Sequence, residues 1–444
     1  MFHLHEDKEK RHLWNIWMFI ISFMLSNIIS GVIYDAYINY LQEVARPIAI
    51  SFWSYYGYAT FISAIMVLFV TKAGYKWTLL FCPSTCFVAL AAVLYIDIPV
   101  IYQITSILSL VGLQLHYAIL APYIAAHTNL ENKTLWYSRT YWIGYAGWAL
   151  MTYVGGFLTV SRFASRLGQS FHEARKLTKN IEIFTPEMKQ IYIYANRDVL
   201  FITAIVAGLS LIPILLIKEK KEDYQNEVDK TKTGETFKVR AKAILKVLTN
   251  KYALSYVCYW ALINFGMGLF SPYYTVFLNR NLGIDRMTAS LLVSISYAAL
   301  VLFMIFTPKV VKRFGQIITL AGVSLLSIPF MIMIANGDKF GVYTIPVVGL
   351  ALFIRSGLMN LGYPVDSALP MEIVPKSLRP AMSSLINLVA GVVSIGAGWY
   401  TGNFLFLEQS GYRIGYYIAA ICYVVGCLIL LIVFTKKYNR LPEQ

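Results

Sequence analysis

The sequence predicts an all-α membrane protein with twelve transmembrane helices in two six-helix bundles. Three observations support this fold class. Apolar residues make up 58% of the 444 residues, and charged residues only 14%. The apolar residues gather in stretches of about 20, the length at which a helix crosses the bilayer core. A charged segment at 218–251 lies near the middle of the chain, with six such stretches on either side.

The distribution of charge predicts how the chain sits in the membrane. The net charge is +15. Because Lys and Arg concentrate in short loops, we interpret this excess as the positive-inside signal and not as a nucleic-acid surface. The short loops place both termini in the cytoplasm, and we expect a multi-pass protein of the plasma (inner) membrane. The five cysteines fall within apolar stretches and outside any zinc-ligand pattern, so we predict no metal and no other cofactor.

The apolar stretches predict three parts of the chain. Residues 1–217 form an N-terminal six-helix bundle, residues 218–251 a cytoplasmic linker, and residues 252–444 a C-terminal six-helix bundle. The predicted spans of the first bundle are 13–40, 48–70, 77–96, 100–125, 141–160 and 186–217. Those of the second bundle are 253–278, 287–307, 317–335, 342–363, 381–405 and 412–434.

Two amphipathic segments lie outside these spans. Apolar residues at 163, 167, 171 and 174 fall on one face of a helix predicted over that outer segment, which would rest on the membrane surface. Thr185-Pro186-Glu187 has the pattern of a helix start. Residues 237–251 predict a basic amphipathic helix within the linker, which favours anionic lipid. A calmodulin-target helix fits the same pattern.

A short loop motif repeats at half-chain distance. Gly74 follows the second span and Gly315 follows the eighth, and they are 315 − 74 = 241 positions apart. Basic residues flank both glycines. Repetition at this scale indicates two related bundles. The residues of the two loops are Lys72, Gly74, Lys76, Lys312, Arg313 and Gly315.

At these loops the chain resembles the major facilitator superfamily of secondary transporters. The family's loop between spans 2 and 3 usually carries a motif of the type Gly, Asp-Arg, Gly-Arg-Lys, and residues 72–76 fit its latter part. The usual acid is replaced, because Val70 and Thr71 stand where it is expected. The resemblance implies the twelve-helix fold of that family and a role for both loops in closing the cytoplasmic side.

The resemblance also implies that spans 1, 4, 7 and 10 line a central cavity. Polar residues inside the membrane fall on these four spans. The candidate substrate and coupling residues are Asn27 and Asp35 on span 1, His116 on span 4, Trp260 and Asn264 on span 7, and Arg355, Tyr363 and Asp366 on span 10.

Arg355 lies near the middle of span 10, where an arginine costs at least about 2.5 kcal/mol unless it faces a cavity or a partner. One interpretation is a site for an anionic group of the substrate. The other is a fixed ion pair with Asp35 or Asp366.

Asp35 is the candidate for a coupling proton, since a carboxylate in a cavity of low polarity can load and unload protons. The alternative is a hydrated residue near the outer surface. His116 can titrate near neutrality, but a single histidine on an apolar face is more often a hydrogen-bonded structural residue.

Together these features predict a secondary active transporter and not an enzyme. We expect it to move a small amphipathic or anionic organic solute by alternating access, as a monomer in contact with membrane lipids and with H⁺ as the coupling ion. A lipid or lysolipid transporter on the same fold is the alternative, and a non-transporting membrane sensor or membrane-embedded enzyme is a third hypothesis.

Overall fold

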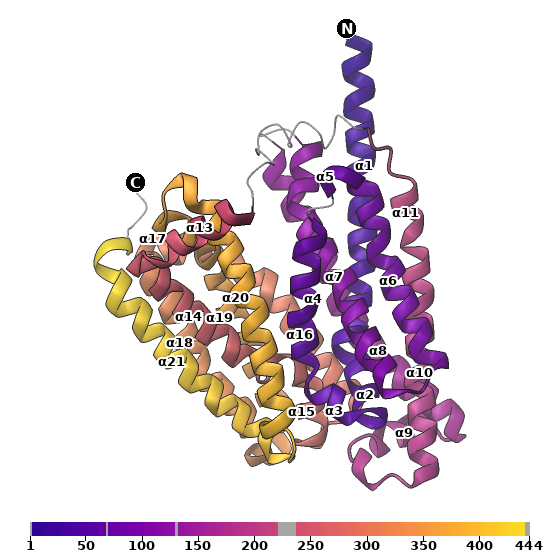
Figure 1. Ribbon diagram of the computed structural model, residues 1–444. Coiled ribbons are helices and arrows are strands. Elements are labelled where there is room, and N and C mark those ends of the chain that lie inside the picture. Colours follow the sequence, from indigo (N-terminus) through magenta and orange to yellow (C-terminus); the bar gives the residue numbers. More distant parts are fainter. Residues whose placement is uncertain (1, 68–69, 129–131, 221–236, 440–444) are drawn as a thin grey trace. The chain divides into compact units, whose positions relative to one another are not determined.

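The computed structural model describes residues 2–67, 70–128, 132–220 and 237–439, and in these residues every regular element is a helix (Figure 1). The first half contains α1 (Phe2–Val32), η1 (Ile33–Tyr37), α2 (Ile38–Val44), α3 (Arg46–Ile50), α4 (Phe52–Val67), α5 (Val70–Ala73), α6 (Tyr75–Tyr95), α7 (Pro99–His127), α8 (Lys133–Leu167), α9 (Phe171–Leu177), η2 (Ile181–Ile183), α10 (Pro186–Leu209) and α11 (Leu211–Leu215). The second half contains α13 (Phe237–Leu248), α14 (Lys251–Gly268), η3 (Ser271–Tyr273), α15 (Tyr274–Arg280), α16 (Arg286–Met304), α17 (Thr307–Phe314), α18 (Gln316–Ala335), η4 (Gly337–Tyr343), α19 (Thr344–Ile373), η5 (Lys376–Leu378), α20 (Arg379–Tyr400), η6 (Thr401–Leu405) and α21 (Ser410–Tyr438).

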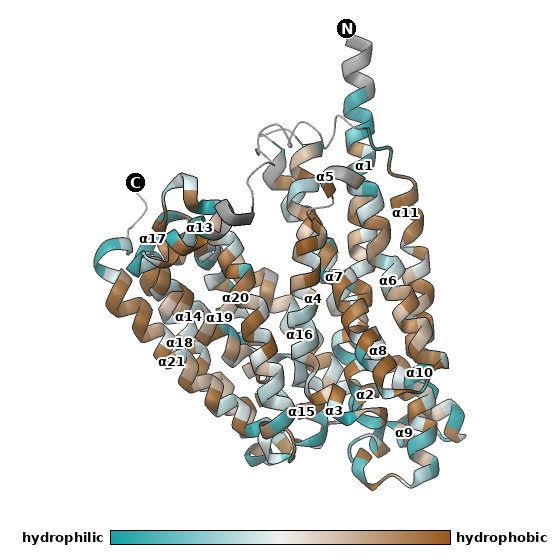
Figure 2. Ribbon diagram, in the orientation of Figure 1, coloured by the Kyte–Doolittle hydropathy of each residue, from teal (hydrophilic) through white to brown (hydrophobic). Residues whose placement is uncertain are grey.

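The predicted all-α membrane fold is confirmed. Eleven helices of the described chain are long and apolar enough to cross a membrane. The remaining predicted span corresponds to α4, which has 16 residues. Hydrophobic residues run along the helices and hydrophilic residues gather at their ends, as a bilayer requires (Figure 2).

Several boundaries differ from the prediction. The first helix begins at Phe2, within the segment predicted as a polar tail. The seventh span is not one helix, because it breaks between α14 and α15 around Pro272. The single amphipathic helix expected over 163–174 is wrong. Gly168 adopts a left-handed φ of 68° and ends α8, and α9 starts afresh at Phe171.

Other local predictions are confirmed. The hydroxyl of Thr185 accepts a hydrogen bond from the Met188 amide at 3.2 Å, which caps the start of α10. In the linker, α13 is the helix predicted from residue 237. Residues 221–236 of that linker lie outside the described chain, and the proposed division at 218–251 stays a prediction.

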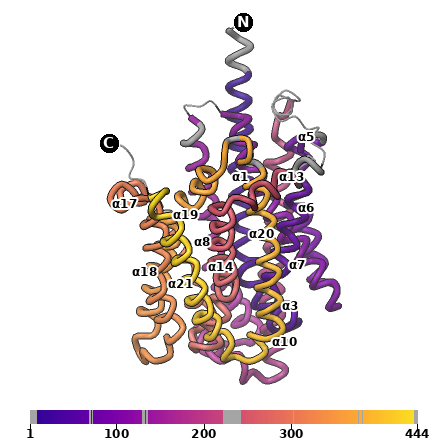
Figure 3. The backbone as a smooth tube through the Cα atoms, turned by 60° about the vertical axis from the view of Figure 1, so that its left-hand side comes forward, coloured from indigo at the N-terminus to yellow at the C-terminus, as the bar shows by residue number. Residues whose placement is uncertain are grey.

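The described chain forms two compact units. Unit 1 comprises residues 1–49, 58–174 and 185–234, and unit 2 comprises residues 50–57, 175–184 and 235–444. Each unit pairs its helices in a related way. In unit 1, α6 packs on α7 and α10, and α1 packs on α8. In unit 2, α18 packs on α19 and α21, and α14 packs on α20 (Figure 3). The same order of pairing in both units supports the internal repeat.

Residues 175–184 belong to unit 2, although the helices that flank them, α9 in part and α10, lie in or lead into unit 1. The Arg175 guanidinium donates to the Asp285 carboxylate at 2.8 and 3.3 Å and to the Thr288 hydroxyl at 2.7 Å. Asn279 donates to the Thr178 carbonyl at 2.7 Å. These polar contacts fasten the segment to the start of α16.

Candidate functional site

The arginine within span 10 is held by aromatic residues of unit 2. Arg355 is 5% exposed. Its guanidinium donates to the hydroxyls of Tyr274 at 2.8 Å and Tyr423 at 2.9 Å. The guanidinium carbon lies 4.7 Å from the ring centre of Phe270, a cation–π contact. We call Arg355, Tyr274, Tyr423 and Phe270 the arginine cage.

Local chain geometry explains the arginine cage. The break after α14 allows the chain to turn, so that Phe270 precedes the 3₁₀ turn and Tyr274 starts α15 on the other side of it. Phe270 also stacks on Tyr416 of α21 at 4.8 Å. Three elements, α15, α19 and α21, therefore converge on one guanidinium.

The arginine cage contains no carboxylate. Among the described residues of unit 2, Arg355 forms no ion pair, and its Nε has no hydrogen-bond partner. Asp366 is engaged elsewhere, so the predicted ion pair between Arg355 and Asp366 is wrong. The reason is distance along α19, where 11 residues separate the two positions and a helix rises about 1.5 Å per residue.

Asp366 has its own aromatic partner. The hydroxyl of Tyr256 lies 3.0 Å from Asp366 Oδ1 and 2.7 Å from its carbonyl oxygen. Tyr256 stands on α14, where Tyr259 packs beside it with ring centres 5.8 Å apart. The contact joins α14 to α19 around a carboxyl group within a membrane span.

The other candidates of unit 2 lie apart from the arginine cage in their contacts. Asn264 donates its amide to the Trp260 carbonyl of its own helix at 2.8 Å, and both side chains are partly buried. Tyr363 is 58% exposed. The shared helical face expected for Arg355, Tyr363 and Asp366 therefore does not give them a shared environment.

In unit 1, Asp35 lies in a π-helical turn. The π-helix η1 interrupts span 1 between α1 and α2, and Asp35 within it is 2% exposed. Asn39 donates its side-chain amide to the Asp35 carbonyl at 2.9 Å and approaches Oδ1 at 3.5 Å. The interpretation of Asp35 as a hydrated surface residue is wrong, since its side chain is buried. Such π turns occur often at functional sites.

His116 and Asn27 form a polar layer between α1 and α7. His116 Nδ1 lies 3.0 Å from the Ser26 hydroxyl, and its ring packs edge-on against Phe19 and Phe23. Its Nε2 is buried without a hydrogen-bond partner. Asn27 accepts a hydrogen bond from the Tyr117 hydroxyl. These contacts agree with the structural role that single histidines usually have.

The two repeated loops have the same backbone geometry. Gly74 has φ 86° and ψ 167°, and Gly315 has φ 82° and ψ 169°. Such angles favour glycine, which explains its recurrence at both positions. Lys312 and Arg313 are exposed, whereas the side chain of Lys72 lies outside the described part of the structure.

A residue at the end of each half caps the helix that follows each glycine. The Glu219 carboxylate accepts from the amides of Tyr75 at 2.7 Å and Lys76 at 3.2 Å. The Asn439 side chain accepts from the amides of Ile317 at 3.0 Å and Ile318 at 3.1 Å. Lys76 adds donors to the carbonyls of residues 215 and 217. Glu219 thus places an acid beside the loop that lacks its expected one.

Sequence reasoning missed the tyrosines that hold the two membrane charges. Tyr256, Tyr274 and Tyr423 are among 32 tyrosines, and their type and spacing do not distinguish them from interfacial ones. The available signal was the polar break at Ser271-Pro272 in an otherwise apolar span. Among the described residues, no group of three His, Cys, Asp or Glu side chains is placed to hold a metal ion.

Comparison with known proteins identifies the family. No curated protein matches the sequence significantly. Among solved structures, a point mutant of the nucleoside transporter NupG superposes with a TM-score of 0.72 at 14% identity, covering 95% of this chain and 100% of that one. The xylose transporter XylE from E. coli, partially occluded and inward open, gives 0.65 at 13%, covering 95% and 98%. A point mutant of the E. coli fucose:proton symporter FucP gives 0.58 at 12%, covering 95% and 99%.

These similarities show the fold. The family model described as Major Facilitator Superfamily matches residues 16–398 and 261–444, which together span nearly the whole chain. The chain therefore belongs to the major facilitator superfamily of membrane transporters.

Proposed function

We propose that this protein is a secondary active transporter of a small anionic organic solute, with Arg355 as the binding group for the anion. The single observation that carries the proposal is the arginine cage. A buried guanidinium in a membrane span is costly, and tyrosine hydroxyls share its charge without cancelling it. An anionic solute would supply the missing negative charge.

The arginine cage suits such a ligand. An arginine presents five donors in a planar fork that matches carboxylate and phosphate groups. Two of its nitrogens donate to tyrosine hydroxyls, and its Nε donates to no described group of unit 2. The Phe270 ring covers one face of the guanidinium and restrains its orientation. A ligand reaching this group would meet a preoriented donor.

Coupling to protons is the second part of the proposal, and Asp35 is the proposed carrier. Its burial in a π-helical turn places a carboxyl group where protonation would remove a charge from a poorly solvated position. Asp366 beside Tyr256 is the other carboxyl group with this property and the alternative carrier. The printed names of two structural neighbours, which are proton symporters for xylose and fucose, are compatible with this mode of coupling.

Transport would follow from two bundles that expose a central site to one side at a time. In this proposal Asn27, His116, Trp260, Asn264 and Tyr363 surround the site, and the loops at Gly74 and Gly315 close the cytoplasmic side. The protein would act as a monomer in the plasma membrane, with both termini in the cytoplasm.

A binding screen tests the proposal. The purified protein is heated with carboxylates, phosphate esters, nucleosides and neutral sugars at two pH values, and its thermal stability is recorded. We expect anionic compounds to stabilise the wild type and not Arg355→Ala. Stabilisation by neutral solutes alone, or an equal response of Arg355→Ala, would remove Arg355 from the site. Flipping of fluorescent lysolipid in the same preparation would instead support a lipid transporter.

A further inference from the structure

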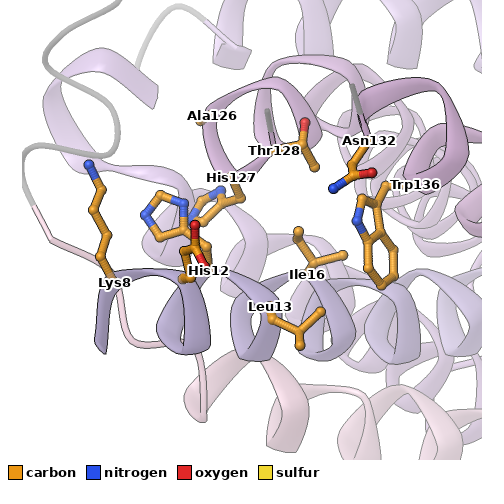
Figure 4. Close-up of a pocket in the computed structure, with 10 residues that line it drawn as sticks. Lys8, His12, Leu13, Ile16, Ala126, His127, Thr128, Asn132 and Trp136 are labelled. Atoms are coloured by element: carbon orange, nitrogen blue, oxygen red, sulfur yellow. The ribbon is translucent and has the colours of Figure 1, made fainter. Parts of the chain in front are cut away.

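A second pocket lies at the other end of the candidate transport region of unit 1, where the chain begins. Its volume is about 530 Å³. It opens between the start of α1, the end of α7 and the start of α8. The pocket is lined by Lys8, Glu9, His12, Leu13, Ile16, Ala126, His127, Thr128, Asn132 and Trp136 (Figure 4). We call it the α1–α7–α8 pocket.

Nitrogen groups dominate the polar lining of the α1–α7–α8 pocket. It has the ammonium of Lys8, two imidazoles and an amide, against the single carboxylate of Glu9. The rings of His12 and His127 lie side by side, with centres 5.1 Å apart. The guanidinium of Arg11 lies 3.4 Å from His12 Nε2.

A further cation lies behind one wall of the pocket. The guanidinium of Arg139 lies 5.0 Å from the ring centre of Trp136. Counting Lys8, Arg11 and Arg139 against Glu9, the surroundings are positive even when both histidines are neutral. A pocket of this charge favours a phosphate-type anion.

The position of the pocket indicates the depth at which it lies in a bilayer. Trp14 and Trp17, on the same turns of α1, are 42% and 40% exposed. Trp17 packs edge-on against Trp136 at 5.6 Å, and Trp14 donates to the Leu216 carbonyl at 3.0 Å. Exposed tryptophans of this kind lie at the level of lipid headgroups. Leu13, 46% exposed, adds an apolar edge to the pocket.

From this geometry we propose that the α1–α7–α8 pocket binds a phosphate-bearing anion, either the headgroup of an anionic lipid or a free phosphate ester. The bound anion would join the ends of α1, α7 and α8. The site is separate from the arginine cage, which lies in unit 2, and it does not depend on the transported solute.

Titration of the full-length protein with short-chain phosphatidylglycerol, short-chain phosphatidylcholine and glycerol phosphate tests this inference by thermal shift. Lys8→Gln removes a charge from the pocket. Lys10→Gln is the matched control, since it removes an exposed charge of the same helix that does not line the pocket. We expect Lys8→Gln to weaken phosphatidylglycerol binding about fivefold and Lys10→Gln to leave it unchanged.

A cavity-filling variant, Thr128→Phe, keeps all the charges and should abolish the response, which guards against misfolding of Lys8→Gln. A response to phosphatidylglycerol alone assigns the pocket to a lipid headgroup, and a response also to glycerol phosphate assigns it to a soluble ester. Equal responses of the wild type, Lys8→Gln and Thr128→Phe, or equal losses in Lys8→Gln and Lys10→Gln, would overturn the proposal.

Discussion

The hydroxyl of Tyr423 accepts a hydrogen bond from the Arg355 guanidinium at 2.9 Å, and Tyr274 accepts a second at 2.8 Å. This relationship makes α21 and α15 the supports of a buried charge on α19. It replaces the ion pair expected with Asp366. A charge held by neutral acceptors retains its attraction for an anion, and that is the physical basis of the proposed solute site.

Replacing Arg355 by Ala should weaken binding of the anionic solute at least about tenfold, because a hydrogen bond to a charged group contributes about 1.5–3 kcal/mol. Isothermal titration or a thermal-shift titration measures the change. Arg413→Ala is the matched control, since Arg413 lies on α21 in an exposed pair with Asp338 at 2.8 Å. Equal effects of the two substitutions would show that loss of charge in general, and not the arginine cage, governs affinity.

Tyr423→Phe separates support of the arginine from contact with the solute. The substitution keeps the ring and removes one acceptor of Arg355, so thermal stability should fall by about 1 kcal/mol while solute binding persists. Loss of binding equal to that of Arg355→Ala would instead mean that the Tyr423 hydroxyl contacts the solute itself.

Asp35→Asn should abolish gradient-driven transport and spare exchange of solute across the membrane. The amide is similar in size to the carboxyl group but cannot carry the coupling proton. Uptake into proteoliposomes, with and without a pH gradient, measures both activities, and Asp366→Asn is the parallel change in unit 2. Loss of both activities would argue for a structural role of Asp35. Normal coupling in Asp35→Asn together with lost coupling in Asp366→Asn would transfer the proton to Asp366.

Gly315→Ala should destabilise the protein by about 1–3 kcal/mol, because φ is 82° and ψ is 169° at this position. A Cβ atom there would also lie 2.4 Å from Asn439 Oδ1, the group that caps α18. Gly322→Ala, on the same helix with open space around the position, should be neutral or slightly stabilising. Thermal unfolding of both variants in detergent compares them. Equal stability would contradict the role assigned to the glycine geometry.

The Arg175–Asp285 pair should make stability depend on pH. Burial raises the pKa of Asp285, but hydrogen bonds from Arg175 and Thr288 outweigh that effect and leave the pKa below its ordinary value. The carboxylate therefore stabilises the fold above the unfolded-state pKa of about 3.9, and this contribution is lost as the pH falls through the lower folded-state pKa.

Asp285→Asn tests this dependence, since Asn can still cap α16 while the charge is removed. At neutral pH the variant should be less stable than the wild type by about 1–2 kcal/mol. The difference should shrink as the pH is lowered below about 4. Asp338→Asn, in a more exposed pair, is the control for loss of a surface carboxylate. A difference that stays constant down to pH 3 would contradict the assignment.

Much of the fold could be predicted from the sequence because lipid imposes strong constraints. Apolar stretches must be helices, and loop charges repeat at half-chain distance. The glycines at 74 and 315 were recognised as equivalent, and their backbone angles agree within a few degrees. The partners that cap the following helices, Glu219 and Asn439, were not predicted. They lie more than 120 positions from the amides they accept, and no local pattern reports such contacts.

The candidate site was predicted less completely for the same physical reason. A charged residue in an apolar span announces itself, so Asp35, Arg355 and Asp366 could be selected directly. Their immediate partners are tyrosines or backbone groups brought together by the break at Pro272 and by the π-helical turn at Asp35. Hydropathy does not report either irregularity, because both leave the apolar character of the span intact. The ion pair with Asp366 failed because proximity along a helix does not imply contact.

The central claim is that the protein carries an anionic solute across the membrane by alternating access through Arg355. Counterflow tests it most directly. Proteoliposomes loaded with unlabelled solute, identified by the binding screen, are diluted into a trace of labelled solute with no ion gradient. The account predicts transient accumulation of label in wild-type liposomes and none with Arg355→Ala. Absence of counterflow in the wild type, or undiminished counterflow in Arg355→Ala, would contradict it.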